Sequence, residues 1–138
     1  MPQPIFPTAV FDPQGGPLIA RIVCGQAQTG GYTYYLWNSV TGSRLDKQEG
    51  RFWDTTPDEF VLAKPVAQHH FHAVEFLGRV TLLPPITAYH ILVEVLQDGR
   101  VVSEVPPMTG AGTPHQTVTF DLFVLLVDRS RASAGGLT

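Results

Sequence analysis

Residues 91–105, with the sequence ILVEVLQDGRVVSEV, constrain the fold of this chain more than any other stretch. Two apolar runs meet at Asp98-Gly99, and this dipeptide is a strong signal for a type I′ hairpin turn, because both central residues of that turn need a positive φ. The predicted hairpin pairs Leu96 with Val101. Both of its faces are mostly apolar, so we expect it to lie centrally in a sheet that is covered on each side.

Other segments also predict strands, because apolar and polar residues alternate in them and turn residues separate them. They are residues 18–26, 32–40, 44–49, 66–83 and 116–127. The predicted fold class is all-β: an antiparallel two-sheet β-sandwich of jelly-roll or immunoglobulin-like type, with a closed barrel as the second choice.

At most one short helix is expected, over residues 57–64. Thr56-Pro57-Asp58-Glu59 fits a capping box with proline at the first helical position. A plain extended segment is the alternative there.

The length of 138 residues fits one domain. We expect an extended proline-rich arm over residues 1–17, a single sandwich over 18–127 and a flexible polar tail over 128–138. The apolar residues of the arm indicate that it docks against its own sandwich or a neighbouring subunit.

The charge pattern limits the partners that we expect. Charged residues make up 15% of the chain, the net charge is −3, and no cluster of Lys and Arg is present. This disfavours nucleic acids and anionic membrane surfaces. So few charges leave much neutral surface, which favours a homo-oligomer or a stable protein partner.

Two further expectations concern location and redox chemistry. No apolar run approaches the roughly 18 residues of a membrane span, and the N-terminus lacks the positive region of a secretory signal. The expected location is therefore the cytoplasm, although non-classical export would leave the same pattern. Cys24, the single cysteine, is in phase with Ala20 and Ile22 and is expected to be a buried, inert thiol.

Histidines gather at residues 69–72, in the sequence HHFH. On a strand, His70 and His72 would point to the same side, and together they could bind one metal ion. With Glu75, this pair resembles the metal-binding motif of the cupin family, in which a His-x-His and a following Glu on a jelly-roll strand hold a metal. The spacing from His72 to Glu75 is shorter than in that family.

A second cupin motif is matched loosely by Gly112-Thr113-Pro114-His115. The resemblance implies a metal-dependent enzyme with a transition metal on His70, His72 and either His115 or His90. The alternative is a polar start of a strand at the rim of the sandwich, with no metal.

Tyr35, Trp37 and Trp53 form a second candidate site. Tyr35 and Trp37 share one face of the predicted strand over 32–40. Flat aromatic rings beside hydrogen-bonding side chains suit sugar rings, and exposed Trp and Tyr are equally typical of protein interfaces. Packing in the core or beneath residues 50–65 is the third interpretation.

No motif for a catalytic serine, a nucleotide phosphate or a zinc protease site occurs in the sequence. The acidic residues Asp58 and Glu59 suit a helix N-terminus rather than catalysis. The expected function is a non-enzymatic structural or interaction β-sandwich that acts through its surface and self-associates. The alternatives are a carbohydrate-binding, lectin-like module and a cupin-like metal-dependent enzyme.

Overall fold

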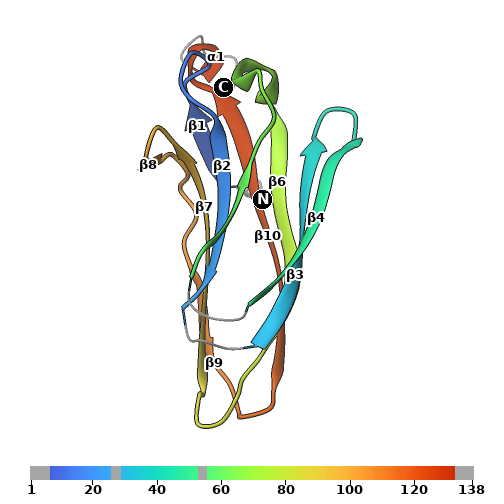
Figure 1. Cartoon of the computed structure of the whole chain (residues 1–138), viewed down its shortest axis with the longest axis vertical. Coiled ribbons are helices and arrows are strands. Elements are labelled where there is room, and N and C mark those ends of the chain that lie inside the picture. Colours follow the sequence, from blue (N-terminus) through green and yellow to red (C-terminus); the bar gives the residue numbers. More distant parts are fainter. Residues whose placement is uncertain (1–6, 26–28, 53–55, 133–138) are drawn as a thin grey trace, which may run out of the picture.

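A computed structural model describes residues 7–25, 29–52 and 56–132. These residues form two β-sheets packed face to face (Figure 1). The first sheet has the order β1 (Thr8–Phe11), β10 (Thr117–Asp128), β6 (His72–Thr81), β3 (Thr29–Asn38) and β4 (Arg44–Phe52). The second has the order β5 (Asp58–Val61), β2 (Leu18–Cys24), β7 (Ala88–Gln97) and β8 (Arg100–Val101), with β9 (Met108–Ala111) also paired to β7. The predicted all-β two-sheet sandwich is confirmed.

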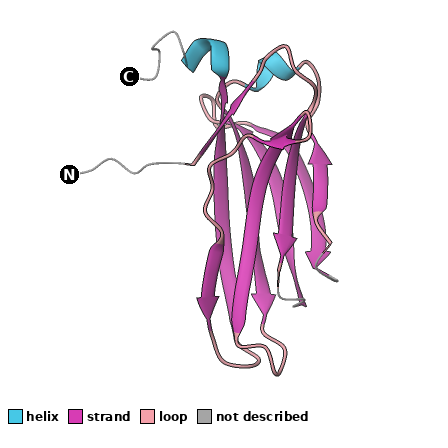
Figure 2. Cartoon of the chain, turned by 90° about the vertical axis from the view of Figure 1, so that its left-hand side faces the viewer, coloured by secondary structure: helices cyan, strands magenta, loops and turns pink. Residues whose placement is uncertain are grey.

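Two short helical segments, the 3-10 helix η1 (Val66–His69) and the α-helix α1 (Arg129–Ala132), lie at the same end of the sandwich (Figure 2). Within the described residues, no helix is long and apolar enough to cross a membrane.

The central hairpin forms as predicted. Asp98 and Gly99 have φ values of 53° and 76°, and Leu96 pairs with Val101. β7 pairs with β2 on one side and with β8 and β9 on the other. The strand after the turn is short, however, and Val101 is 45% exposed, so the predicted cover on both faces does not extend to β8.

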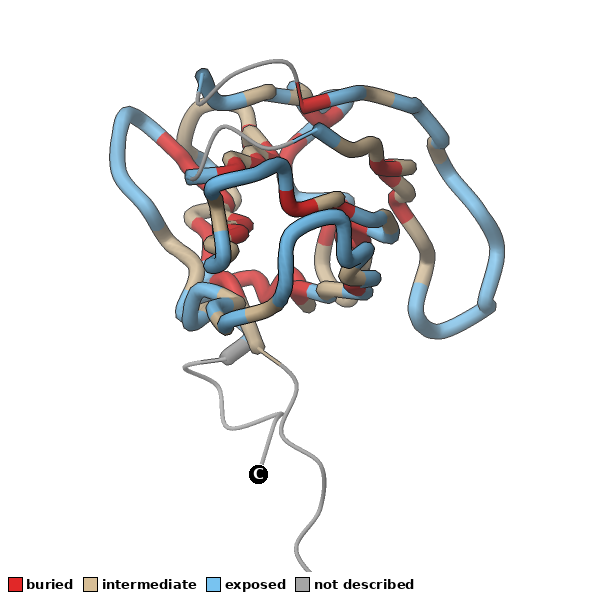
Figure 3. Tube along the Cα trace, turned by 90° about the horizontal axis from the view of Figure 1, so that it is seen from below, coloured by how far each residue is buried: buried red, intermediate tan, exposed pale blue. Residues whose placement is uncertain are grey.

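The core lies between the sheets, where buried positions alternate with more exposed ones along the strands (Figure 3). Aromatic rings fill one part of it. Tyr34 stacks on Phe60 with ring centroids 4.7 Å apart and planes 2° apart, and Phe76 packs against both rings. Cys24 is a buried free thiol, as expected.

The helix predicted over residues 57–64 does not form, and the extended alternative is found. Residues 58–61 are β5, which pairs antiparallel with β2. A capping box contributes about 1 kcal/mol, whereas burying a phenylalanine side chain contributes about 2 kcal/mol. The strand gains the stacking of Phe60 on Tyr34 and ladder hydrogen bonds. Asp58, expected at a helix N-terminus, instead accepts a 2.6 Å hydrogen bond from the Tyr32 hydroxyl.

The predicted arm over residues 1–17 contains a strand of the sandwich. β1 pairs with β10, and its residues Ala9 and Phe11 are fully buried. This pair is parallel, whereas the predicted sandwich was antiparallel throughout. Val10 N–H also donates to the carbonyl of Val102, so β1 joins the two sheets along one side.

At the other terminus, β10 ends at Asp128 and α1 lies within the predicted tail over 128–138. Sequence patterns missed β1 because its four residues stand among prolines and its pairing partner is the last strand of the chain.

Candidate functional site on the outer face of the first sheet

The register of four strands defines a regular surface on the solvent side of the first sheet. On β3, Tyr32, Tyr34 and Leu36 are buried in the core, so the alternate residues point outward. From one end to the other, the outward rows across β10, β6, β3 and β4 are Thr119–Arg79–Gly31–Arg51, Asp121–Leu77–Thr33–Glu49, Phe123–Glu75–Tyr35–Lys47 and Leu125–Ala73–Trp37. In the last row β4 is irregular, because the register shifts between Leu36 and Trp37. We call these four rows the outer face.

The predicted aromatic residues Tyr35 and Trp37 come together on this face. Their rings stack with centroids 5.2 Å apart and planes 28° apart. Each ring therefore covers one flat side of the other, which leaves less open aromatic surface for a sugar ring. Trp53 lies outside the described residues.

A buried carboxyl group stands beside the aromatic pair. Glu75 lies between Tyr35 and Phe123 in its row and is 7% exposed. Its Oε1 accepts a 2.9 Å hydrogen bond from Trp37 Nε1. The sequence indicated Glu75 only as a metal ligand, because nothing local shows that it is buried between β3 and β10 and bonded to Trp37.

Glu75 forms a carboxyl pair with Asp121 of the neighbouring strand. Burial, the hydrogen bond to Asp121 and the charge of Asp121 together raise the pKa of Glu75 from 4.5 to about 7, and the Trp37 N–H partly opposes this rise. Two adjacent carboxyl groups favour holding one proton between them. At neutral pH, Glu75 is therefore partly protonated on a surface that offers it little water.

Exposed apolar side chains surround this pair. Leu77 is 44% exposed and Phe123 is 37% exposed. Together with Tyr35 and Trp37 they give one half of the outer face an apolar and aromatic character. Contiguous apolar surface of this kind marks interaction sites on folded proteins.

The other half of the outer face is hollowed. A depression of about 790 Å³ is lined by residues that include Gly31, Thr33, Leu77, Arg79, Arg51 and Thr119. Gly31 opens it, because a side chain at this position would point outward between Arg79 and Arg51. A Cβ atom at Gly31 would contact only the Gly50 carbonyl, at 3.3 Å, and the Arg51 side chain, at 4.0 Å.

The three histidines of residues 69–72 lie at the end of the sandwich near η1, where they make structural contacts. His69 is 1% exposed, with Nε2 2.6 Å from the Ala63 carbonyl and Nδ1 3.0 Å from His72 Nδ1. Burial lowers the pKa of both His69 and His72. Nδ1 of His70 accepts a 3.0 Å hydrogen bond from the Asp128 N–H.

The structure does not bring the predicted metal ligands together. β6 begins only at His72, and Phe71 has a φ of 61°, which breaks the alternation that would have aligned His70 with His72. His115 lies beyond the far end of β6, where its N–H donates to Leu82, about 30 Å away at ~3.3 Å per residue. The described residues hold no group of three or more His, Cys, Asp or Glu side chains that could bind a metal.

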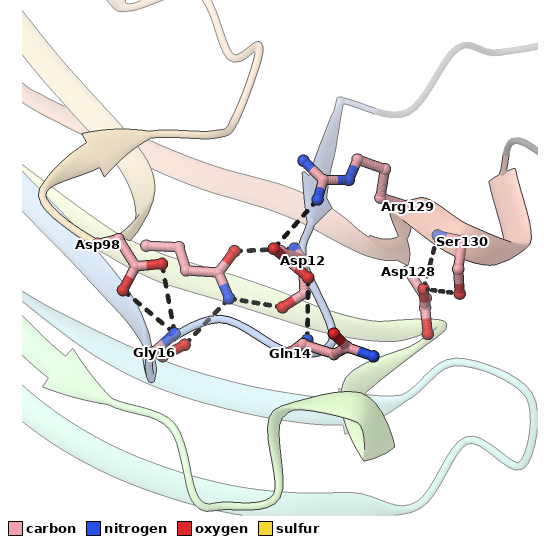
Figure 4. Close-up of polar contacts among 8 residues, drawn as sticks. Asp12, Gln14, Gly16, Asp98, Asp128, Arg129 and Ser130 are labelled. Carbon is pink, nitrogen blue, oxygen red and sulfur yellow. Dashed lines mark hydrogen bonds and ion pairs between the residues drawn. The ribbon is translucent and has the colours of Figure 1, made fainter.

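At the end of the sandwich that holds η1 and α1, a polar network joins the segment after β1 to the central hairpin (Figure 4). The side chain of Gln97 is buried and exchanges hydrogen bonds of 2.8 and 2.7 Å with the backbone N–H and carbonyl of Asp12. Asp98 accepts a 3.1 Å hydrogen bond from the Gly16 N–H, and Arg129 forms a 3.0 Å ion pair with Asp12. These contacts satisfy the polar groups and have a structural role.

The fold places the chain in the class of two-sheet β-sandwich proteins with largely antiparallel strands. Comparison with models of known protein families, with curated proteins and with solved structures finds no match for this chain. Since a fold class does not define an activity, the residues of the outer face carry the information about function.

Proposed function

We propose that this protein is a non-enzymatic interaction subunit that self-associates through the outer face. The observation that carries the proposal is the exposed apolar surface around Leu77 and Phe123, 44% and 37% exposed, beside the stacked pair of Tyr35 and Trp37. The centre of a protein interface is typically enriched in aromatic residues and contains few charged residues. Covering this surface removes apolar area from water, which drives association.

The sheet edges are less suited to association than the face. The free edge of the first sheet is β4, which carries Lys47, Glu49 and Arg51 along its length. In the second sheet the edge strands β5, β8 and β9 are only four, two and four residues long. Charged, short and irregular edges resist the addition of a further strand, so a partner is directed to the face.

The stacking of Tyr35 on Trp37 also supports a protein partner over a sugar, because sugar rings lie on open aromatic faces and each ring here covers its neighbour. The carboxyl pair supports a non-enzymatic role. A pair with one raised pKa can serve acid–base catalysis, but Glu75 is 7% exposed and its Oε1 is held by Trp37.

The test is the mass of the full chain in solution over the micromolar range, by native mass spectrometry and sedimentation. We expect an oligomer that Leu77→Glu converts to monomer. Val61→Glu is the matched control, because Val61 is an exposed valine, 65% accessible, on β5 of the other sheet. Circular dichroism confirms that both variants fold.

A wild-type chain that stays monomeric, or two variants with equal effects, would contradict the proposal. A carbohydrate-binding module would instead show a tryptophan fluorescence change with added sugars and no change of mass.

A further inference from the structure

We infer that two copies pack outer face to outer face about a two-fold axis that crosses the strands between the Thr33 row and the Tyr35 row. The aromatic pair of each copy then covers the depression of the other. This inference rests on the proposed self-association and specifies its geometry and its contacting residues.

The two-fold axis determines which residues meet. An axis across the strands reverses the order of the four rows, so that each strand faces its own copy running in the opposite direction. Trp37 then lies over Gly31 of the second copy, and Tyr35 lies over Thr33 of the second copy. In such an isologous contact, every pairing occurs twice.

The shape of the face fits this arrangement. The stacked rings stand at one end of the outer-face segment of β3 and the glycine that opens the depression stands at the other. The six steps along the strand from Gly31 to Trp37 span about 20 Å. Reversing the strand therefore places each pair of rings on the hollow of the other copy. Arg79, beside Gly31 in its row, is placed next to the Trp37 ring, where a guanidinium group favours an aromatic face.

Charge selects this axis over the other face-to-face possibility. With the axis across the strands, Glu49 faces Lys47 of the second copy, because their rows are adjacent on β4, and Arg51 comes opposite the irregular start of β4 at Arg44. With an axis along the strands, each row would face itself in reverse, and Asp121 would lie against Glu49 of the second copy. Like charges placed opposite each other across an interface disfavour that pairing.

The outer face is four strands wide, at about 4.8 Å per strand, and about 20 Å long. Its area is therefore smaller than the roughly 800 Å² that each partner commonly buries in a stable complex. The dimer is therefore expected to dissociate in the micromolar range.

The experiment is a charge reversal and its compensation. Lys47→Glu and Glu49→Lys each place like charges together at both symmetry-related contacts. The double variant Lys47→Glu with Glu49→Lys restores opposite charges and keeps the composition of the chain. Both residues are exposed on an edge strand, so the fold tolerates these changes.

Sedimentation equilibrium measures the dimer dissociation constant of each protein. We expect each single reversal to raise it by about tenfold or more, and the double variant to return it to within a few-fold of the wild-type value. A second variant, Gly31→Val, places a branched side chain in the depression and is expected to weaken the dimer while the chain stays folded.

Each other result has a distinct meaning. Dimers that form equally well in both single reversals would refute this arrangement and leave the proposed self-association intact. Single reversals that weaken the dimer without rescue in the double variant would refute the Glu49–Lys47 pairing. A wild-type chain that is monomeric throughout the range would refute this inference and the proposed function together.

Discussion

Glu75 gives the stability of the sandwich a definite dependence on pH. Burial and the neighbouring Asp121 raise the pKa of Glu75 from 4.5 to about 7. Between these two values the folded protein holds a proton that the unfolded chain has released. The contribution of Glu75 to the free energy of unfolding is therefore largest below the unfolded pKa, falls as pH rises through this window, and levels off above about 7.

The size of the effect follows from the two pKa values. A change of one pKa unit corresponds to about 1.4 kcal/mol, so the full difference gives about 3 kcal/mol as an upper limit. The Trp37 N–H stabilises the ionised carboxylate, and solvent lies close to this outward position, so we expect a measured effect of about 1 to 3 kcal/mol.

The perturbation that tests this reasoning is Glu75→Gln. A glutamine amide can accept the hydrogen bond from Trp37 and donate to Asp121, but it does not titrate. Urea unfolding of both proteins is measured from about pH 5 to about pH 8, at a concentration where the chain is monomeric. We expect the wild type to lose stability relative to the variant as pH rises through this range.

The difference between the two proteins isolates Glu75 from the histidines. His69 and His72 have lowered pKa values, so they weaken the fold as pH falls, which is the opposite sign. They are present in both proteins, and their contribution cancels in the difference. A difference in the free energy of unfolding between wild type and Glu75→Gln that stays the same at every pH would refute the reasoning.

Three further substitutions, the last with a control variant, test the fold. Gln97→Ala removes the paired hydrogen bonds to Asp12 and is expected to cost about 2 to 3 kcal/mol in urea unfolding, with faster amide exchange in the segment after β1; unchanged exchange would contradict the network. Gly78→Ala places a Cβ against a backbone carbonyl of β3, so the thermal midpoint should fall by several degrees, equivalent to about 1 to 3 kcal/mol, and an unchanged midpoint would be inconsistent with this contact. Phe60 is half-buried against the core, so Phe60→Ala should cost about 2 to 3 kcal/mol, whereas Val61→Ala next to it, 65% exposed, should change stability by about 0.5 kcal/mol or less; equal losses would rule out packing of Phe60 against the core.

The elements that the sequence predicts well are those governed by local physics. The turn at Asp98-Gly99 forms because two adjacent residues adopt positive φ, and the strands of the sandwich alternate because a pleated strand presents successive side chains to opposite faces. The adjacency of Tyr35 and Trp37 follows from the same alternation, since they stand two residues apart on β3.

The elements that local patterns missed depend on partners far away in the chain. The capping box before residues 57–64 is a valid helix signal, but pairing with β2 and stacking of Phe60 on Tyr34 favour a strand. β1 is a strand because the last strand of the chain provides its ladder. His70 and His72 do not share one strand face because Phe71 has a positive φ, which their spacing in the sequence does not reveal.

The sequence by itself determined an all-β chain, its central hairpin and the aromatic pair, because each depends on residues within a few positions of one another. Tertiary structure alone decided the outer face as a site. The burial of Glu75, its pairing with Asp121 and the depression at Gly31 each require that β3, β6 and β10 meet in one register. Register depends on the packing of the whole sandwich, since a shift of one residue would turn every outward side chain into the core.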